Sequence, residues 1–497
     1  MKILSFLVLL ASGACLGQQT TPSEPQNPQL PSAQQQQQQP AEAAAGEPAQ
    51  QPVQREEPEV IQPLQPAEVP AEATEAATEY RGPAILSRGG EPSVRQGSEL
   101  FTIRPFAAVD TIYDTGLVTP GLNHDGRFGY DSGFGVEAAF GVTGARSWRR
   151  SSLAVDYRGA ARHYTEQTYY DGSDHTLLLR YENQVSRRWL IALTEGASSF
   201  SRTSGLPFAA VQGYDPTFGM LTGNELFDGR TNALYSAAQA VYQQTARLSF
   251  GLGANGFVVR RRSDALTGAT GWAGTGDVAY RLGRYSSAGV DYSFSRFEYQ
   301  NRFGESTLHG LAANYARRLN RSWELSLRAG ALRVETSRLQ VVTLDPAIAA
   351  ILGRSTAVSI FYGVTYLPQY GARLARYFRR SIFSVGYDRT VTPGNGVFLT
   401  STTDVFDASY SDTLSSRLSF SLGAGASRLK ALSQALGNYT SYGVRAGVSY
   451  RLAASLSVLA RINGTMRSME SSQIDRNAYR IAFGIGWTPG DYPVSVW

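Results

Sequence analysis

The chain has 497 residues, 18% of them charged, with a formal net charge of +5 and a single cysteine, Cys15. One cysteine excludes a disulfide within the chain and a thiolate metal cluster. A basic balance can accompany nucleic-acid binding, but here the arginines alternate with apolar residues inside predicted strands of a secreted chain. We therefore expect no nucleic-acid partner.

The first 17 residues have the features of a bacterial secretory signal peptide. A basic start at Lys2 precedes a short apolar stretch from Ile3 to Ala11, and small residues follow at 12–14. This stretch is too short for a membrane anchor. Cys15 follows a lipobox-like Ser-Gly-Ala, but the leucine usual three places before such a cysteine is missing. Ordinary cleavage near Ala14 or Gly17 is thus favoured over acylation of Cys15.

Residues 18–95 form a segment rich in Gln, Pro, Ala and Glu, including a run of six glutamines from Gln34 to Gln39. Such a composition cannot bury enough apolar surface to fold, so we predict a disordered tail. Between residues 18 and 79 it carries ten Glu and one basic residue, Arg55. We expect this acidic tail to lie in the periplasm, where an envelope partner could bind it.

Residues 96–497 alternate in chemistry with a period of two. From Tyr479 to Trp487 the odd positions are aromatic or aliphatic, and the even positions are Arg480, alanine or glycine. A period of two places these sets on opposite faces of a strand. Strands of about ten residues with apolar-out, polar-in faces are typical of a transmembrane barrel. We predict an all-β fold: an antiparallel up-and-down barrel inserted in the lipid of the bacterial outer membrane.

The predicted strands number about 18, from 100–113 to 477–488. The number falls to 16 if the first strand, which contains Pro105, and the fourteenth, 403–412, are absent. Short connections, including 144–147 and 319–321, alternate with long ones such as 114–129, 201–230 and 336–355. Short periplasmic turns opposite long outer loops give this pattern. Trp148, Trp189, Trp323 and Trp487 all fall at short-turn ends, where aromatic rings suit a membrane interface.

The parity of the strands predicts which side chains line the lumen. Charge facing lipid at mid-bilayer would cost about 2–4 kcal/mol per arginine, so charged strand residues must point inward. A barrel of this size is too wide for side chains to fill. The predicted pore-lining residues are Glu137, Asp156, Arg158, Arg162, Arg180, Asp277, Asp291, Arg328, Arg445, Arg461 and Arg480.

The sequence offers no catalytic constellation. Its four histidines lack the spacing of a zinc site, and no Gly-x-Ser-x-Gly motif occurs. His163 near an outer edge could belong to a barrel-wall lipase, but a solvated or interfacial histidine is the better interpretation. We expect no enzyme, no metal and no cofactor.

The long connection 201–230 is the candidate constriction loop. Residues 214–219, Tyr-Asp-Pro-Thr-Phe-Gly, faintly resemble the inward-folded loop of general diffusion porins, although Thr217 and Met220 replace that loop's Glu and second Gly. Asp215, Phe218, Glu225 and Asp228 are the candidates for an eyelet facing the wall arginines. An ordinary surface loop is an equally good interpretation.

A second resemblance covers about 400 residues. The stretch Gly-Tyr-Asp-Arg-Thr-Val-Thr-Pro-Gly-Asn-Gly at 386–396, followed by Val-Phe-Leu-Thr-Ser-Thr at 397–402, resembles the β-barrel porin families of exopolysaccharide gene clusters. The segments 227–231 and 258–262 share this likeness. The resemblance implies a porin-like barrel that releases secreted polysaccharide.

Two functions follow, both of them passive. The first is porin-like diffusion of small hydrophilic solutes with a modest preference for anions, because arginines outnumber carboxylates on the predicted inner wall. The second is an exit barrel for exopolysaccharide. A soluble propeller is disfavoured, since no repeat of 40–50 residues with blade signatures occurs.

Overall fold

The computed structural model describes residues 101–494, except 123–127, 167, 202–229, 264–265, 301–303, 346–348, 352, 433–436, 471–473 and 491. The predicted signal peptide (1–17), the predicted tail (18–95) and residues 202–229 of the predicted constriction loop lie outside the described residues. So do the constriction candidates Asp215, Phe218, Glu225 and Asp228.

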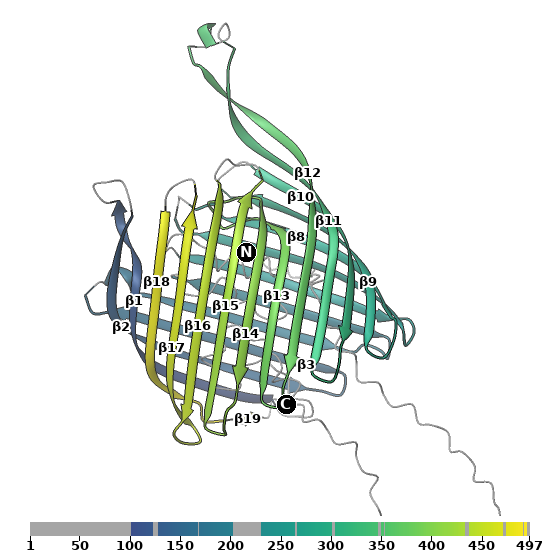
Figure 1. The fold of residues 1–497 in the computed structure, drawn as a ribbon, viewed down its shortest axis with the longest axis vertical. Coiled ribbons are helices and arrows are strands. Elements are labelled where there is room, and N and C mark those ends of the chain that lie inside the picture. The colour runs from purple at the N-terminus through teal and green to yellow at the C-terminus, as the bar shows by residue number, and fades with distance from the viewer. Residues whose placement is uncertain are drawn as a thin grey trace, which may run out of the picture.

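Eighteen long strands of the described chain form one closed antiparallel barrel, as the alternation predicted (Figure 1). Each strand pairs with the next, and β1 pairs with β18 with Ala107 opposite Trp487, so the sheet closes on itself. The first and fourteenth strands are both present. A short extra strand, β19, pairs with the start of β1 beside this seam.

The elements have the following bounds: β1 Phe101–Leu122, β2 Phe128–Ser147, β3 Ser151–Tyr164, η1 Thr168–Tyr170, β4 Gly172–Asn183, β5 Trp189–Phe200, β6 Thr231–Gln243, β7 Leu248–Arg261, β8 Ala269–Arg281, β9 Ser286–Tyr299, β10 Gly304–Arg318, β11 Trp323–Thr343, β12 Thr356–Tyr377, β13 Ser381–Thr392, β14 Ser401–Asp412, β15 Leu418–Ala431, β16 Asn438–Arg451, β17 Leu456–Met469, β18 Ile474–Trp487 and β19 Tyr492–Val494.

The burial pattern is the reverse of that in a water-soluble protein. On β18, Tyr479, Ile481 and Phe483 are 48%, 50% and 60% exposed, whereas Arg480 and Ala482 are only 6% and 3% exposed. Apolar side chains therefore cover the outside of the barrel and polar ones lie inside. Such a wall is stable only against hydrocarbon, and closure leaves no unpaired sheet edge at the seam. In the described part of the chain, no helix is long and apolar enough to cross a membrane.

Aromatic residues mark the short-turn end of the barrel. Trp148, Trp189 and Trp487 are each 42–45% exposed, and the Trp189 ring lies 4.8 Å from that of Tyr242 on the next strand. These amphipathic rings suit the boundary between hydrocarbon and water. One predicted turn is wrong: residues 144–147 end β2, and the chain reverses at 148–150, where the Trp148 amide donates to Ser151.

The hairpin of β11 and β12 is longer than predicted. Its strands pair from Trp323 opposite Arg376 to Thr343 opposite Thr356, whereas β13 pairs with β12 only from Tyr370 onward. Residues 356–369 thus lack a neighbour on one side, and the hairpin projects beyond the rim (Figure 1). The first part of the predicted loop at 336–355, residues 336–343, is therefore strand, because Leu339 and its neighbours continue the pairing with β12.

The lumen as the candidate functional site

All eleven predicted pore-lining residues lie on the inner face of the barrel. On each strand they share the parity of buried residues, and the exposed apolar residues hold the other parity. Six of them are at most 9% exposed: Glu137, Asp156, Arg162, Asp291, Arg461 and Arg480. Burial of so many charges requires partners, because an unpaired buried ion loses its hydration without compensation.

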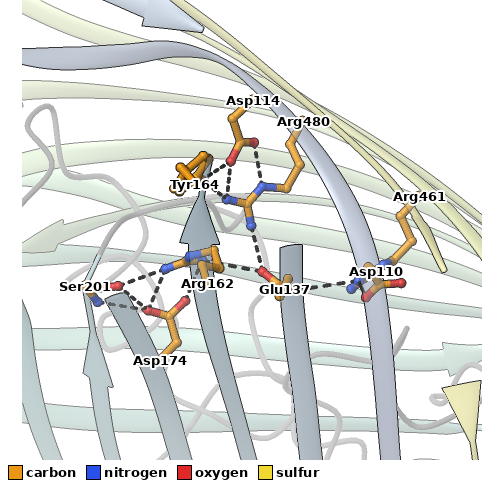
Figure 2. A network of polar contacts seen from close by, with 9 residues as sticks. All are labelled: Asp110, Asp114, Glu137, Arg162, Tyr164, Asp174, Ser201, Arg461 and Arg480. Carbon is orange, nitrogen blue, oxygen red and sulfur yellow. Dashed lines mark hydrogen bonds and ion pairs between the residues drawn. The ribbon is translucent and has the colours of Figure 1, made fainter. Parts of the chain in front are cut away.

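The largest set of partners crosses the seam between β18 and β1 (Figure 2). Arg480 on β18 donates to both carboxylate oxygens of Asp114 on β1, at 2.7 and 2.6 Å, and to Glu137 on β2 at 3.1 Å. The Tyr164 hydroxyl on β3 also donates to Asp114. A planar guanidinium with five donors suits such bidentate binding. One side chain near the end of the chain therefore joins β18 to β1, β2 and β3 at the start of the barrel.

Glu137 is the centre of this seam network. It accepts from Arg480 and lies 3.7 Å from Nη1 of Arg162 and 3.6 Å from Nη2 of Arg461. Arg461 on β17 also pairs with Asp110 on β1. Arg162 reaches in the other direction to Asp174 on β4, at 2.9 Å. The network extends further to Ser201, whose hydroxyl and amide contact Asp174.

Other predicted lumen charges pair locally. Arg158 donates to Asp156 at 2.5 Å, and Arg180 donates to Glu182 at 2.7 Å, each two residues along one strand. Arg328 on β11 contacts Asp291 on β9 at 2.6 Å, and Asn314 on the strand between them donates to the same carboxylate. Of the two remaining residues, Asp277 lies against Gly251 and Arg445 lies against Gly423.

A segment between β13 and β14, residues 393–400, folds into the barrel. Asn395 and Phe398 are 0% exposed and Thr400 is 1% exposed. The turn depends on Gly394 and Gly396, whose φ angles of 77° and 92° suit residues without Cβ. The Asn395 side chain accepts from the Phe398 amide at 3.0 Å and so closes the turn locally.

This inward segment is anchored on both sides. Phe398 packs in one cluster with Leu429, Tyr439 and Met469 of β15–β17. Leu399 packs in another with residues of β8–β11, among them Phe297, Leu308, Leu332 and Val334. The Thr400 hydroxyl bonds that of Tyr299 at 2.8 Å, and Thr267 donates to the Gly396 carbonyl at 2.9 Å. The segment therefore lies inside the barrel, in contact with β8–β11 on one side and with β15–β17 on the other.

Sequence reasoning missed several of these residues. Asp110 falls in the predicted first strand with the parity of buried Ile112, so parity alone could have placed it inward. Asp114 lies one residue beyond the predicted end of that strand. No pattern signalled that 393–400 turns inward, since its polar and glycine residues also suit an exposed loop.

The described residues offer little for catalysis. His163 lies on the outer face, 67% exposed at its side chain, with Nδ1 2.7 Å from Asp171. Among these residues, no group of three or more His, Cys, Asp or Glu side chains could hold a metal ion.

A closed antiparallel barrel with an apolar outer wall, aromatic rings at one boundary and a charged interior is an integral outer-membrane β-barrel. No family model matches the sequence, and no curated protein matches it. Solved structures similar to the chain include three porins.

OccK2 (OpdF) of Pseudomonas aeruginosa is 10% identical, over 78% of this chain and 98% of that one, with a TM-score of 0.38. OpdQ of the same organism is 11% identical, over 79% and 100%, with a TM-score of 0.38. OccAB3 of Acinetobacter baumannii is 10% identical, over 78% and 99%, with a TM-score of 0.37. These likenesses are too distant to transfer a substrate, so function must come from the chain's own lumen.

Proposed function

We propose that this protein is a passive outer-membrane channel for small hydrophilic solutes. The observation that carries the proposal is a polar inner wall in a closed barrel of 18 strands. A barrel of that size holds more space than its own side chains fill. The inward segment at 393–400 reduces the cross-section and so favours small solutes over large ones.

A modest preference for anions follows from the charges that remain after pairing. The seam arginines are neutralised by Asp110, Asp114, Glu137 and Asp174, and set little net field. Elsewhere, Arg373 and Arg445 both interact with one carboxylate, that of Asp407. Asp388 on β13 also faces this wall beside Gly371, so the positive excess there is small and we expect only a modest attraction of anions.

Reversal potentials in a salt gradient across planar bilayers test this function. We expect the wild type to conduct and to prefer anions, and Arg445→Glu to shift the potential toward cation preference. The matched control is Lys430→Glu, the same charge change at an exposed position of outward parity on β15, which should leave selectivity unchanged. Selectivity should fall at 1 M salt, where the screening length is about 3 Å. Absence of conductance would refute the channel, and cation preference would refute the charge argument.

A second candidate is release of exopolysaccharide. It is favoured by one observation: residues 386–402, which carry the resemblance to the exopolysaccharide porins, include the segment that enters the lumen. Liposome swelling with neutral oligosaccharides of increasing length separates the two functions. A steep decline in permeation with chain length supports diffusion, whereas permeation that is insensitive to length supports polymer release.

A further inference from the structure

A depression of about 830 Å³ lies on the outer wall of β13–β18, the strands at the front of Figure 1. Ala426 of β15 lines it and pairs directly with Phe406 of β14 on one side and with Tyr442 of β16 on the other. Phe406 and Tyr442 are 43% and 54% exposed, so both rings face away from the lumen. A methyl group between two outward rings leaves a hollow in the wall. Apart from Ser427 and Met469, all residues that line the depression have this outward parity.

A row of polar side chains borders the rings on the side of the long connections. Strand register creates this row, because its members are successive partners across β14–β18: Asp404, Arg428, Thr440, Ser468 and Asp475. Tyr387 donates to Asp404 at 2.7 Å, and Arg389 lies 3.6 Å from the same oxygen, so this carboxylate is held within the wall. Arg428 and Asp475 are exposed, and neither forms an ion pair among the described residues. Both charges can therefore contact a ligand.

On the other side of the rings the wall is small and apolar. The residues two positions closer to the short turns are successive partners across β14–β17: Ala408, Ala424, Val444 and Gly464. Val444 is 56% exposed. Along the membrane normal, the outer wall thus passes from polar side chains through aromatic rings to an apolar surface. A lipid presents headgroup, boundary region and acyl chains in the same order.

The height of the polar row places it at the outer boundary of the membrane. Arg428 lies ten residues from Leu418, where β15 begins at its short-turn end. Ten residues span about 34 Å along a strand, or about 26 Å along the membrane normal at a tilt near 40°. The apolar band of such barrels is about 25 Å tall, and the long connections face the cell exterior. The polar row therefore lies among the lipid headgroups of the outer leaflet.

The lining of the depression favours a sugar headgroup over a simple phosphate ester. An exposed ring face such as that of Tyr442 carries partial negative charge and packs against the C–H groups of a pyranose. A carboxylate such as that of Asp475 accepts hydrogen bonds from several hydroxyl groups. The Arg428 guanidinium binds one anionic substituent in a bidentate manner. A lipid with only a phosphate ester would satisfy Arg428 but would offer no pyranose to Tyr442 and no array of hydroxyl groups to Asp475.

We propose that this depression binds one glycolipid of the outer leaflet. A pyranose ring of the glycolipid packs between Phe406 and Tyr442, and its anionic substituent pairs with Arg428. Its hydroxyl groups donate to Asp475, and its acyl chains cover the small apolar residues beneath the rings. A soluble saccharide would leave that apolar surface uncovered. The site faces lipid rather than the lumen, so the proposal is independent of the channel function.

Native mass spectrometry of the full chain, released from detergent micelles that contain a defined lipid, tests the proposal. The probe is lipid A, an acylated glucosamine disaccharide that carries phosphate. We expect the wild type to retain one lipid A, and Arg428→Glu and Tyr442→Ala each to raise its dissociation constant about tenfold or more. The matched controls, Arg260→Glu and Trp272→Ala, should leave binding unchanged. Arg260 is exposed with outward parity on β7, and Trp272 is 45% exposed on the outer face of β8, both outside the depression.

Two further probes identify the part of the lipid that is recognised. Phosphatidic acid keeps the charge and the acyl chains but lacks the sugar, whereas deacylated lipid A keeps the sugar but lacks the chains. We expect both to bind about tenfold or more weakly than lipid A. Heat-modifiable gel mobility establishes that each variant still forms the barrel.

A wild type that retains no lipid A overturns the proposal, as does lipid A binding that is indifferent to both Arg428→Glu and Tyr442→Ala. Equal affinity for phosphatidic acid also overturns it, because the wall would then recognise only an anionic lipid. Equal affinity for deacylated lipid A overturns it in favour of a site for free saccharide.

Discussion

The two sides of the barrel interior are held by different chemistry. Along the seam, β17, β18 and β1–β4 carry buried ion pairs such as Arg480 with Asp114. Beneath the inward segment, β8–β11 carry apolar side chains and hydroxyls such as those of Leu332 and Tyr299, the latter bonded to Thr400 of the segment. The charged side lies where the ladder is short, since β1 and β18 pair only over Ala107–Asp114. Ion pairs thus connect β1 and β18, whose backbone hydrogen bonding covers only a short stretch. Apolar packing instead anchors the inward segment against strands that are paired along their length.

The largest expected effect is at the seam. Arg480→Met leaves the buried carboxylates of Asp114 and Glu137 without their main partner, and breaking a buried pair costs about 3–5 kcal/mol. Urea unfolding of the barrel in lipid vesicles, followed by tryptophan fluorescence, measures the loss. Adding Asp114→Asn to the variant should restore part of the stability, because it removes one uncompensated charge. A loss below about 1 kcal/mol would contradict the role of ion pairs at the seam.

A smaller effect is expected beneath the inward segment. Thr400→Val keeps the shape of the side chain but removes a buried hydroxyl that bonds Tyr299 and Ser306. Leaving such groups unsatisfied costs about 1–3 kcal/mol, so we expect a loss in that range. The same variant should increase the open-channel current noise, because the segment is then less firmly held. Unchanged noise together with unchanged stability would show that packing of Leu399 and Phe398 alone holds the segment.

The smallest effect is expected for a lumen pair open to water. Arg180 and Glu182 are 29% and 35% exposed at their side chains, in contrast to the buried pairs of the seam. Solvent screens such pairs, and removal of one partner typically costs about 0–1 kcal/mol. Arg180→Ala should therefore shift the urea midpoint only slightly. A loss of stability equal to that caused by Arg480→Met would contradict the predicted difference between buried pairs at the seam and pairs open to water.

Local alternation predicted the barrel because each strand shows its own period of two, as the residues from Tyr479 to Trp487 do. It also placed Arg480 inward. It could not assign the partner of Arg480, because Asp114 lies 366 residues away and meets it only when the seam closes in one register. In contrast, the Arg158–Asp156 pair lies within one strand and is visible from spacing alone.

The inward segment and the long hairpin could not be predicted from the sequence, for a related reason. Whether Phe398 faces water or a cluster depends on Leu429, Tyr439 and Met469, which approach it only in the finished barrel. Likewise, Leu339 extends β11 because Ile360 lies opposite it, although the segment has the length of an ordinary loop. Strand ends set by tertiary pairing are not encoded in local periodicity.

The projecting hairpin of β11 and β12 offers a site at which an inserted peptide could be displayed. Its upper part pairs only within itself, and its tip includes Gly353, with a φ of 65° and nothing within 4 Å of an added Cβ. It belongs to the long-connection side, which in bacterial barrels faces the cell exterior. A peptide epitope inserted after Gly353 would stand clear of the membrane on a two-stranded stalk. Antibody could then label intact cells while the barrel beneath keeps every strand it needs.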